Sequence, residues 1–328
     1  MAKVQNLLIY FPIIKTFKEE LTKILPEAKI LHRSSEDLTQ EDVRMADVIF
    51  GNVPQAMLQD APNLKWLHLA SAGTDGYTGI AERGVLLTNG TGAYNDTIAE
   101  HMLALTSALC IHLPTYMHQQ AEHRWERAGW SGYIMDSTVV ILGCGNIGCA
   151  YAKRMKALGA YTIGVRRSPG TKPDYVDEMV TMEEMDQVLP RGDIVAMVMP
   201  NTPETKGIMD SRRIALMKDG ALLINVGRGN ALDADALYDA LTSGKLGGAG
   251  IDVAHTEPLP QDDKLWDAPN LIITPHAAGG WNFDAIHANP FMVKQVSRVF
   301  RANLEEYLAD KPMRNTIDLT TGYTKKAR

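Results

Sequence analysis

Short hydrophobic runs alternate with amphipathic stretches along the first part of the chain. Runs of three or four apolar residues, a length typical of buried strands, are separated by segments with helical spacing such as 17–25. The strands that this pattern predicts are 7–10, 47–50, 66–69 and 85–87. This part of the chain is therefore expected to form one α/β unit.

The same alternation restarts after residue 160 and predicts a second α/β unit. Its expected strands are 161–165, 194–198, 221–226, 248–253 and 271–274, with a helix over 234–241 among the segments between them. Between the two units, apolar positions at helical spacing predict one helix over 97–117, which meets no helix breaker before Pro114. A further amphipathic helix over 289–308 is expected to pack back on the first unit.

A glycine-rich turn opens the second unit. An apolar strand runs into Gly143, Gly145 and Gly148, which have the G-x-G-x-x-G spacing, and a helical segment follows. Glycines at these positions permit a tight turn and the close approach of a phosphate, and the helix amides at Asn146 and Ile147 would face it. The motif predicts a dinucleotide-binding turn, although a turn that serves packing alone can have the same spacing.

Length and composition favour a two-domain protein that acts on small molecules. The chain has 328 residues, more than one hydrophobic core usually holds, and 45% of them are hydrophobic. The net charge is −6 without long acidic or basic runs, so we expect neither nucleic acid nor a membrane as a partner. With no signal segment in view, the sequence predicts a cytoplasmic protein whose three cysteines, Cys110, Cys144 and Cys149, are free thiols.

Three reactive side chains each follow a predicted strand of the second unit, namely Arg228, Glu257 and His276. Because ligands of a parallel sheet bind at the carboxyl ends of its strands, we expect them at one edge. Arginine can bind a carboxylate bidentately and polarise an adjacent oxo group, and histidine can donate a proton to that group. A neighbouring glutamate favours the protonated imidazole. The set predicts reduction of a 2-oxo acid, with Arg228 as binder, His276 as acid and Glu257 as its orienting carboxylate.

Each of these residues alone also fits an ordinary loop position exposed to solvent. Their joint placement after neighbouring strands of a nucleotide-binding sheet is what favours a catalytic site. The nine histidines show no metal-ligand spacing beside cysteines or carboxylates, so we expect no metal site.

Several motifs, in sequence order, resemble those of the D-isomer-specific 2-hydroxyacid dehydrogenases, in particular the glyoxylate and hydroxypyruvate reductases. The turn 71–75 and the helix opening 95–100 are similar to further segments of that family. The main matches are Gly143-Cys144-Gly145-Asn146-Ile147-Gly148, Asn225-Val226-Gly227-Arg228-Gly229, Asp252-Val253 with Glu257-Pro258-Leu259-Pro260, and Thr274-Pro275-His276.

The resemblance implies an α/β protein with two doubly wound parallel-sheet domains. A dinucleotide-binding Rossmann domain, 99–288, would be inserted into a discontinuous flavodoxin-like substrate-binding lid domain made of 1–98 and 289–328. The resemblance also implies a homodimer and an NAD(P)-dependent D-2-hydroxyacid dehydrogenase, with Arg228, Glu257 and His276 in the roles given above.

Further site residues are implied by the resemblance alone. The amides of Ala72, Gly73 and Thr74 would receive the substrate carboxylate, and Asp252 would hold the nicotinamide carboxamide. Besides the glycine turn, the implied cofactor contacts are Pro200 and Thr205 in the adenosine-side loop, together with Thr97, Val226 and Gly279.

The end of the second Rossmann strand bears on the choice of cofactor. NAD-binding units usually carry Asp or Glu there, which binds the ribose 2′-hydroxyl. In this chain the predicted strand 161–165 ends in Arg166, Arg167 and Ser168. Two guanidinium groups and a hydroxyl suit a 2′-phosphate, so NADP(H) is the preferred cofactor, with NAD(H) as the alternative if both arginines face solvent.

By analogy within the family, glyoxylate or hydroxypyruvate is the leading substrate. Aromatic residues near predicted loop ends either line the substrate pocket or serve packing: Tyr10, Phe11, Tyr77, Tyr94 and Trp281. One alternative is an NAD-linked phosphoglycerate or formate dehydrogenase. Two features argue against it, namely the paired arginines and the expected lack of a regulatory domain after residue 328. The other is a nucleotide-sensing corepressor or scaffold with the same fold and no turnover.

Overall fold

The computed structural model describes residues 3–129, 132–168, 170–280 and 289–318. The chain divides into two compact units, one made of Met1–Tyr94 with Gly280–Arg328 and the other of Asn95–Gly279. The first boundary lies earlier than the predicted 98/99, because the helix that starts at Asn95 belongs wholly to the second unit. The second boundary lies at 279/280, earlier than the predicted 288/289. Trp281 lies outside the described residues.

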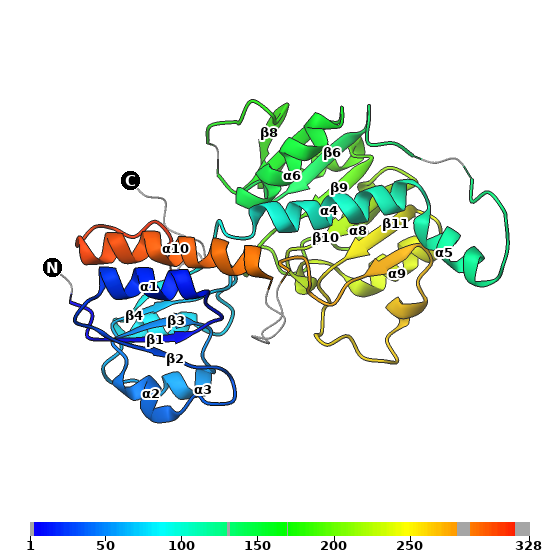
Figure 1. Cartoon of the computed structure of the whole chain (residues 1–328). Helices are drawn as coiled ribbons and strands as arrows, with labels where there is room; N and C mark the ends of the chain where they lie inside the picture. The colour runs from blue at the N-terminus through cyan, green and yellow to red at the C-terminus, as the bar shows by residue number, and fades with distance from the viewer. Residues whose placement is uncertain (1–2, 130–131, 169, 281–288, 319–328) are drawn as a thin grey trace. The chain divides into compact units, whose positions relative to one another are not determined.

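The first unit contains a five-stranded parallel sheet in the order β2-β1-β3-β4-β5, which is the flavodoxin-like order (Figure 1). Helices α1 and α10 cover one face of this sheet, and α2 and α3 lie on the other. The bounds are β1 Asn6–Tyr10, α1 Lys15–Ile24, β2 Lys29–His32, α2 Gln40–Met45, β3 Val48–Gly51, α3 Gln55–Leu58, β4 Trp66–His68, β5 Leu86–Thr88 and α10 Pro290–Leu308. The sequence pattern missed β2, because this edge strand is only half buried.

The C-terminal helix α10 packs on the first unit, which confirms the prediction for 289–308. Its Phe300 ring is stacked on Phe50 of β3 with the centroids 4.2 Å apart, and it also stacks on Trp66 of β4. All three side chains are fully buried. The aromatic cluster therefore joins the last helix of the chain to strands near its beginning.

The second unit contains a seven-stranded parallel sheet in the order β12-β11-β10-β9-β6-β7-β8, the doubly wound Rossmann order extended by one strand. The predicted fold class is thereby confirmed for both units. The bounds are α4 Asn95–Cys110, α5 Leu113–Ala121, β6 Thr138–Leu142, α6 Asn146–Ala157, β7 Tyr161–Arg166, β8 Glu178–Thr181, α7 Met185–Val188, β9 Ile194–Met197, α8 Ser211–Leu216, β10 Ala221–Asn225, α9 Ala234–Thr242, β11 Leu246–Ile251 and β12 Leu271–Ile273.

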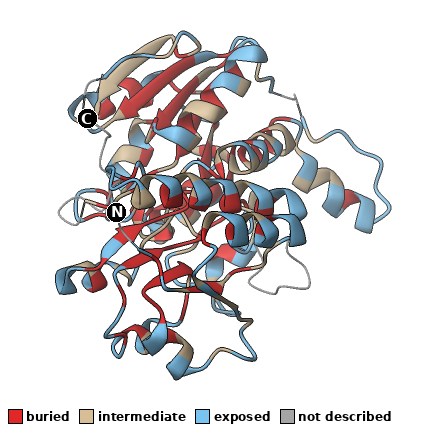
Figure 2. Cartoon of the chain, turned by 60° about the vertical axis from the view of Figure 1, so that its left-hand side comes forward, coloured by how far each residue is buried: buried red, intermediate tan, exposed pale blue. Residues whose placement is uncertain are grey.

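Alternate residues of the central strands face two different cores. On β6, Val139 and Ile141 belong to the core that includes residues of α4 and α6, whereas Val140 and Leu142 belong to the core that includes residues of α8 and α9. All four are fully buried, and the strands form the buried centre of the unit (Figure 2). A strand with both faces covered reads as a continuous apolar run, which is why the sequence pattern found it.

The predicted single helix over 97–117 is wrong, because two helices occupy this stretch. Helix α4 ends at Cys110, His112 takes a left-handed φ of 56°, and α5 begins at Leu113. Pro114 has no amide to donate to the carbonyl of Cys110, so a helix cannot continue through it. That carbonyl accepts a hydrogen bond from the amide of Gly132 instead, at 2.8 Å.

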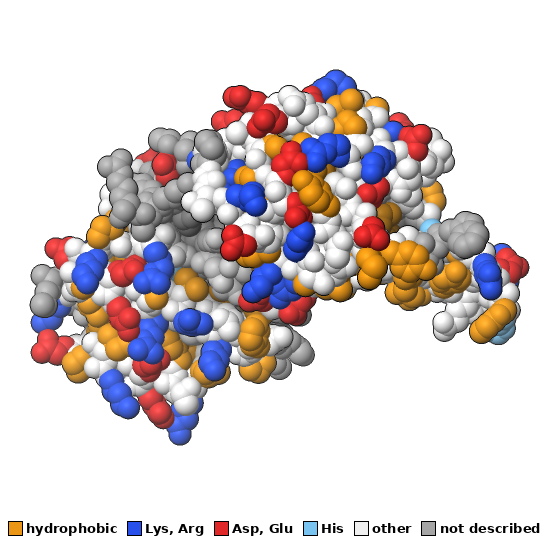
Figure 3. Space-filling view, turned by 90° about the horizontal axis from the view of Figure 1, so that it is seen from above, with side chains coloured by type: hydrophobic (Ala, Val, Ile, Leu, Met, Phe, Trp, Pro, Cys, Tyr) orange, Lys and Arg blue, Asp and Glu red, His pale blue; other side chains and the backbone are white. Residues whose placement is uncertain are grey.

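The segment that follows α4 exposes several large apolar side chains. Figure 3 shows hydrophobic side chains gathered along the arm that carries α5. The exposed residues here are Ile111, Leu113, Met117, Trp125, Tyr133 and Met135. Contiguous exposed apolar surface of this kind is typical of protein interfaces.

His68 of β4 is fully buried in the aromatic core of the first unit, and we expect it to make folding pH-dependent. Burial lowers the pKa of its imidazole from 6.5 to about 3. Between these two values the unfolded chain therefore binds one more proton than the folded protein. The contribution of His68 to stability is fully present above pH 6.5 and is lost as the pH falls. His68 should contribute a loss of about 2 kcal/mol in unfolding free energy between pH 7 and 5.

Urea unfolding of His68→Asn at several pH values checks this, because the variant should lose that part of the pH dependence. His118→Asn is the matched control, since the His118 side chain is 71% exposed. An unchanged pH dependence in His68→Asn contradicts the assignment.

Candidate functional site

The glycine turn connects β6 to α6 with very close backbone packing. Gly143 has a φ of +95°, and a Cβ placed on it would lie 2.7 Å from the carbonyl oxygen of Val198. A Cβ on Gly148, in the first turn of α6, would lie 2.5 Å from the carbonyl oxygen of Gly143. The first and third glycines are therefore required by the protein's own packing.

The middle glycine, Gly145, is not required by packing against the protein's own backbone. Gly145 is the N-cap residue of α6, no side chain caps this helix end, and a Cβ placed on Gly145 would meet no heavy atom within 4 Å. Gly145 and Asn146 are exposed. The first turn of α6 therefore presents backbone amides and the positive end of the helix dipole to open space, which suits a pyrophosphate.

An open cavity of about 410 Å³ adjoins this turn. Three basic side chains, Lys153, Arg154 and Arg166, contribute to its wall. Arg166 is the last residue of β7, whereas Arg167 and Ser168 follow it as exposed residues and are not among those that line the cavity. The lining residues are Asn95, Asp96, Cys144, Gly145, Asn146, Cys149, Ala150, Lys153, Arg154, Arg166 and Tyr175.

At the other half of the sheet, Asp252 organises the loop that follows β12. The Asp252 side chain is 2% exposed, and its two carboxylate oxygens accept hydrogen bonds from the amides of Ala277 and Ala278 at 2.8 and 2.9 Å. The Thr274 hydroxyl donates to the same carboxylate at 2.5 Å. Asp252 therefore anchors both ends of the turn that carries His276.

His276 faces Glu257 at this edge. The imidazole Nδ1 lies 2.8 Å from Glu257 Oε2, and Oε1 of the same carboxylate accepts a hydrogen bond from the amide of Ala254 at 3.0 Å. With Nδ1 directed at the carboxylate, Nε2 is the ring nitrogen that is left for a ligand. The imidazole side chain is 52% exposed, so Nε2 is on a ring that solvent and small molecules reach.

The turn after β10 holds Arg228. A Cβ on Gly227 would lie 2.6 Å from the carbonyl oxygen of Met199, and a Cβ on Gly229 only 1.8 Å from the carbonyl oxygen of Ala254. Arg228 is half-buried, and one of its amino groups donates to the carbonyl of Gly227 at 2.8 Å. Gly229 therefore packs the Arg228 turn closely against the loop that leads to Glu257, and Gly227 packs the same turn against the residues after β9.

The remaining predicted cofactor residues of the second unit lie in loops after strands, except Thr97, which is on α4. The Thr205 hydroxyl is buried, accepts from the amide of Thr202 and lies 2.6 Å from the carbonyl oxygen of Pro200, so it shapes its own loop. Val226 is buried after β10, Thr97 is half-buried in the first turn of α4, and Gly279 is the last residue of the unit. Their contacts with a cofactor stay predictions.

In the first unit, the loop with Ala72, Gly73 and Thr74 is held by side chains around it. The amide oxygen of Asn52 accepts hydrogen bonds from the two amides that precede Ala72, and Asn89 donates to the carbonyl of Ala72 at 2.6 Å. Within the described part of the chain, no hydrogen bond uses the amides of residues 72–74 as donors. These amides suit the predicted carboxylate contact, which stays a prediction.

Two residues beside Asp252, His101 and Thr274, have roles that the sequence did not predict. His101 on α4 has its Nε2 3.0 Å from the Thr274 hydroxyl and 3.7 Å from Asp252. These contacts join residues more than 150 positions apart, so no local pattern indicates them. A histidine on the buried side of an otherwise apolar helix face was the one available indication.

Most of the candidate pocket aromatics serve packing instead. Phe11 and Tyr94 are buried, and the Tyr94 hydroxyl donates to the carbonyl of Ala70. The Tyr77 hydroxyl donates to the carbonyl of Val53. The hydroxyls of Tyr77 and Tyr94 are thus both used inside the first unit.

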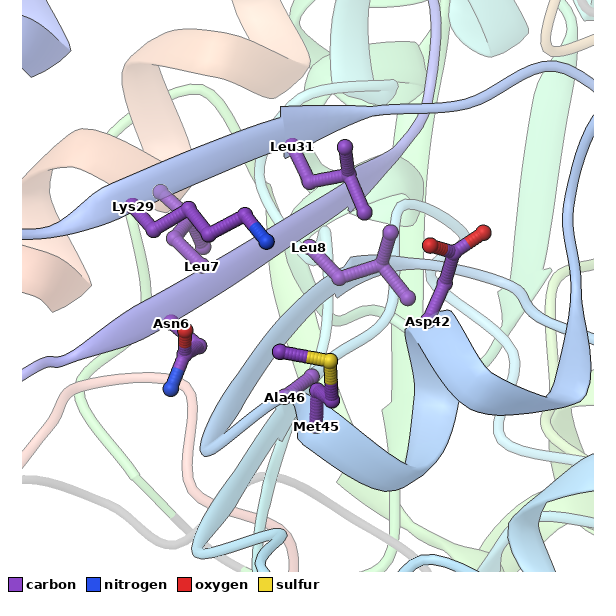
Figure 4. Close-up of a pocket in the computed structure, with 8 residues that line it drawn as sticks. All are labelled: Asn6, Leu7, Leu8, Lys29, Leu31, Asp42, Met45 and Ala46. Carbon is purple, nitrogen blue, oxygen red and sulfur yellow. The ribbon is translucent and has the colours of Figure 1, made fainter.

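A second cavity lies in the first unit between β1, β2 and α2 (Figure 4). It has a volume of about 30 Å³ and is bordered by Leu8, Leu31 and Met45, with Asp42 at its edge. This space has the size of one water molecule, so it is not a substrate site.

Comparisons with known proteins agree with this geometry. The sequence pattern described as D-isomer specific 2-hydroxyacid dehydrogenase, NAD binding domain, matches residues 103–278. A D-3-phosphoglycerate dehydrogenase from Mycobacterium tuberculosis is 35% identical over 228 residues, which is 68% of this chain and 43% of that protein. The chain therefore spans less than half the length of this relative.

Two solved structures resemble the whole chain. A D-isomer specific 2-hydroxyacid dehydrogenase family protein from Aeromonas salmonicida has a TM-score of 0.83 and 29% identity, covering 97% of this chain and all of that one. A D-isomer specific 2-hydroxyacid dehydrogenase from Xanthobacter autotrophicus Py2, in complex with NADPH and MES, has a TM-score of 0.80 and 26% identity, covering 98% and 100%.

The chain belongs to the D-isomer specific 2-hydroxyacid dehydrogenase family. The predictions of an NAD(P)-dependent D-2-hydroxyacid dehydrogenase and of a Rossmann unit are confirmed at the level of the family. Among the described residues, no helix combines the length and the apolar content that crossing a membrane requires.

Substitution of the middle glycine separates binding from folding. The methyl group of Gly145→Ala would stand in open space, and Gly145 has a negative φ of −91°, so the protein should fold. The methyl group should interfere with the pyrophosphate that we expect at this helix end. We expect the Kd for NADPH in calorimetric titration to rise about tenfold or more, a loss of about 1.4 kcal/mol in binding free energy.

Gly148→Ala is the matched comparison, since its methyl group would collide with the carbonyl of Gly143. That variant should lose about 1–3 kcal/mol of stability in thermal unfolding. Unchanged NADPH affinity in Gly145→Ala means that the dinucleotide does not bind at this turn.

Proposed function

We propose that this protein reduces a small 2-oxo acid to the D-2-hydroxy acid with NADPH as the hydride donor. The observation that carries the proposal is the His276–Glu257 pair, with 2.8 Å between Nδ1 and Oε2, on a turn anchored by Asp252. The same sheet carries the glycine turn and the Arg228 turn at the carboxyl ends of its strands. An acid, an anion-binding group and a dinucleotide turn together define reduction of an oxo acid.

In this mechanism the side chains position and protonate the substrate. Arg228 binds the substrate carboxylate and polarises the adjacent oxo group, and His276 donates the proton on Nε2 to the oxo oxygen. Glu257 fixes the ring orientation through Nδ1 and stabilises the imidazolium before transfer. When bound, the dinucleotide supplies the hydride that adds to the oxo carbon.

The preference for NADPH is supported by charge at the end of β7. An acidic side chain that would repel a 2′-phosphate is absent from this strand end, where Arg166, Arg167 and Ser168 stand. Arg166 also lines the cavity beside the glycine turn, which supports a proposed contact of its guanidinium with phosphate oxygens. NAD(H) stays the alternative cofactor.

Glyoxylate and hydroxypyruvate are the proposed substrates, and the amides of Ala72, Gly73 and Thr74 are proposed to bind the substrate carboxylate. A homodimer is part of the proposal, because the segment after α4 exposes apolar side chains such as Met117 and Trp125, and a second copy would cover them. Location in the cytoplasm also stays a prediction.

Turnover with a panel of 2-oxo acids tests the proposal most directly. We expect purified protein to oxidise NADPH in the presence of glyoxylate or hydroxypyruvate. The oxidation is measured as the loss of absorbance of the reduced nicotinamide. His276→Asn should lower kcat by about 10² to 10⁴ with nearly unchanged NADPH affinity, since it removes only the proton donor. Asparagine is the chosen replacement because it tolerates the left-handed φ of 53° at this position.

The control for this variant is His255→Asn, which removes an imidazole from the neighbouring loop and should leave kcat unchanged. Preferred turnover of 3-phosphohydroxypyruvate would indicate the phosphoglycerate dehydrogenase alternative. NADPH binding without turnover of any panel member would favour the nucleotide-sensing scaffold, and an undiminished kcat in His276→Asn would remove this residue from the mechanism.

Cofactor selectivity is tested at the two arginines. Arg166→Ala should lower kcat/KM for NADPH about tenfold or more and leave that for NADH nearly unchanged, because a charge-assisted hydrogen bond contributes about 1.5–3 kcal/mol. Arg167→Ala, whose side chain is exposed outside the cavity lining, should have the smaller effect. Equal kcat/KM for the two cofactors in the unmodified protein contradicts the preference.

A further inference from the structure

Two of the three cysteines lie side by side within the dinucleotide turn. Cys144 follows the first glycine and is fully buried, and Cys149 stands partly exposed in the first helical turn of α6. Their Sγ atoms are 3.7 Å apart, and Cys149 Sγ also lies 3.6 Å from the carbonyl oxygen of Cys144. A disulfide has an S–S distance of about 2.05 Å, so a small local movement would join them.

The surroundings of the two thiols shift their pKa values in opposite directions. Both line the cavity of about 410 Å³, together with the Arg166 guanidinium and Tyr175. The hydrogen bond with Cys144, aided by the charge of Arg166, lowers the pKa of Cys149 to about 7. The same sulfur contact and burial raise the pKa of Cys144. Cys149, which is also the more exposed of the two, is therefore the cysteine that more readily forms a thiolate.

Backbone packing seats the buried sulfur beside its partner. A Cβ placed on Gly164 of β7 would lie 2.8 Å from Cys144 Sγ, so the absence of a side chain at that position makes room for the sulfur. Cys110, at the end of α4, offers an internal comparison, because burial alone raises its pKa. Reactivity toward oxidants should therefore be confined to the pair in the turn.

We propose that Cys149 and Cys144 form a peroxide-reactive thiol pair that closes to a disulfide across the dinucleotide turn. The Cys149 thiolate attacks one oxygen of hydrogen peroxide, the O–O bond breaks, and a sulfenic acid and hydroxide form. The Cys144 sulfur then attacks the sulfenic sulfur, the S–O bond breaks, and hydroxide leaves. The two hydroxide ions are neutralised by the two thiol protons, so one peroxide and two thiols yield one disulfide and two waters.

The disulfide would change the segment that the cofactor needs. The closed ring contains Gly145, Asn146, Ile147 and Gly148, the residues whose amides stand at the start of α6. Drawing Cys144 and Cys149 together shifts this backbone, and a bound dinucleotide in turn covers the cavity onto which Cys149 opens. Oxidation and dinucleotide binding therefore oppose each other reciprocally. This coupling rests on the proposed placement of the dinucleotide, whereas disulfide formation does not.

The test treats the reduced full-length protein with a small excess of hydrogen peroxide, with and without saturating NADP⁺, and then alkylates the remaining thiols. Peptide 128–153 contains both cysteines and no internal Lys or Arg, so trypsin releases them together. Without NADP⁺ this peptide should lose two hydrogens and resist alkylation, while Cys110 is still alkylated after denaturation. Saturating NADP⁺ should slow the oxidation about tenfold or more, and the Kd for NADP⁺ should rise about tenfold on oxidation and recover with dithiothreitol.

Two variants assign the roles within the pair. In Cys144→Ala, Cys149 should stop at the sulfenic acid, which dimedone traps, and Cys149→Ala should give neither product. If a variant fails to fold, dimedone added during oxidation of the unmodified protein still shows which cysteine reacts first.

Peptide 128–153 that stays reduced, or a disulfide found only between two chains, overturns the proposal. A disulfide that forms without any change in NADP⁺ affinity overturns the coupling. Reduced protein that fails to bind NADP⁺ counts against the proposed function instead, so the two failures are distinguishable.

Discussion

The carboxylate of Asp252 is the interaction on which the geometry of the candidate active site depends. A carboxylate that is 2% exposed is costly to bury unless its oxygens are hydrogen-bonded. Here two consecutive backbone amides and the Thr274 hydroxyl supply those bonds. The turn of residues 274–278 is therefore held in place through hydrogen bonds of its backbone amides to Asp252. Within this turn His276 takes a left-handed conformation, and its ring faces Glu257. An imidazole on an unanchored loop would lose this orientation.

A second constraint is the close approach of loops at the edge of the parallel sheet. Gly227 and Gly229 each lie so close to a neighbouring backbone that any side chain would collide. The turn after β10, with Arg228, and the loop after β11, with Glu257, are therefore held together by packing of the main chain. The glycine turn after β6 uses the same principle, because Gly148 of α6 packs on the carbonyl of Gly143. In both turns glycine is required because the neighbouring backbone leaves no room for a side chain.

The sequence predicted most of the fold because fully buried parallel strands read as apolar runs, as β6 and β9 do. The sequence pattern missed β2 and β8, whose residues are only partly buried. It also joined α4 and α5 into one helix, because the spacing of apolar residues does not indicate where the first helix ends ahead of Pro114. The candidate catalytic residues could be predicted because each lies in the loop that follows a strand of the second unit. The contacts of His101 and Thr274 with Asp252 join distant parts of the chain, so no local pattern indicated them. Cys144 and Cys149 are only five residues apart, but the approach of their sulfur atoms depends on the geometry of the turn.

Transfer of a hydride to the oxo carbon of a 2-oxo acid can be followed with a cofactor that carries deuterium. Hydroxypyruvate can be incubated with the protein and NADPH that carries deuterium at both C4 positions, and the glycerate formed can be analysed by mass and configuration. If the protein transfers this hydride, the product is D-glycerate with one deuterium at C2. Glycerate without deuterium, glycerate of the L configuration, or no conversion of any 2-oxo acid would contradict the proposed function.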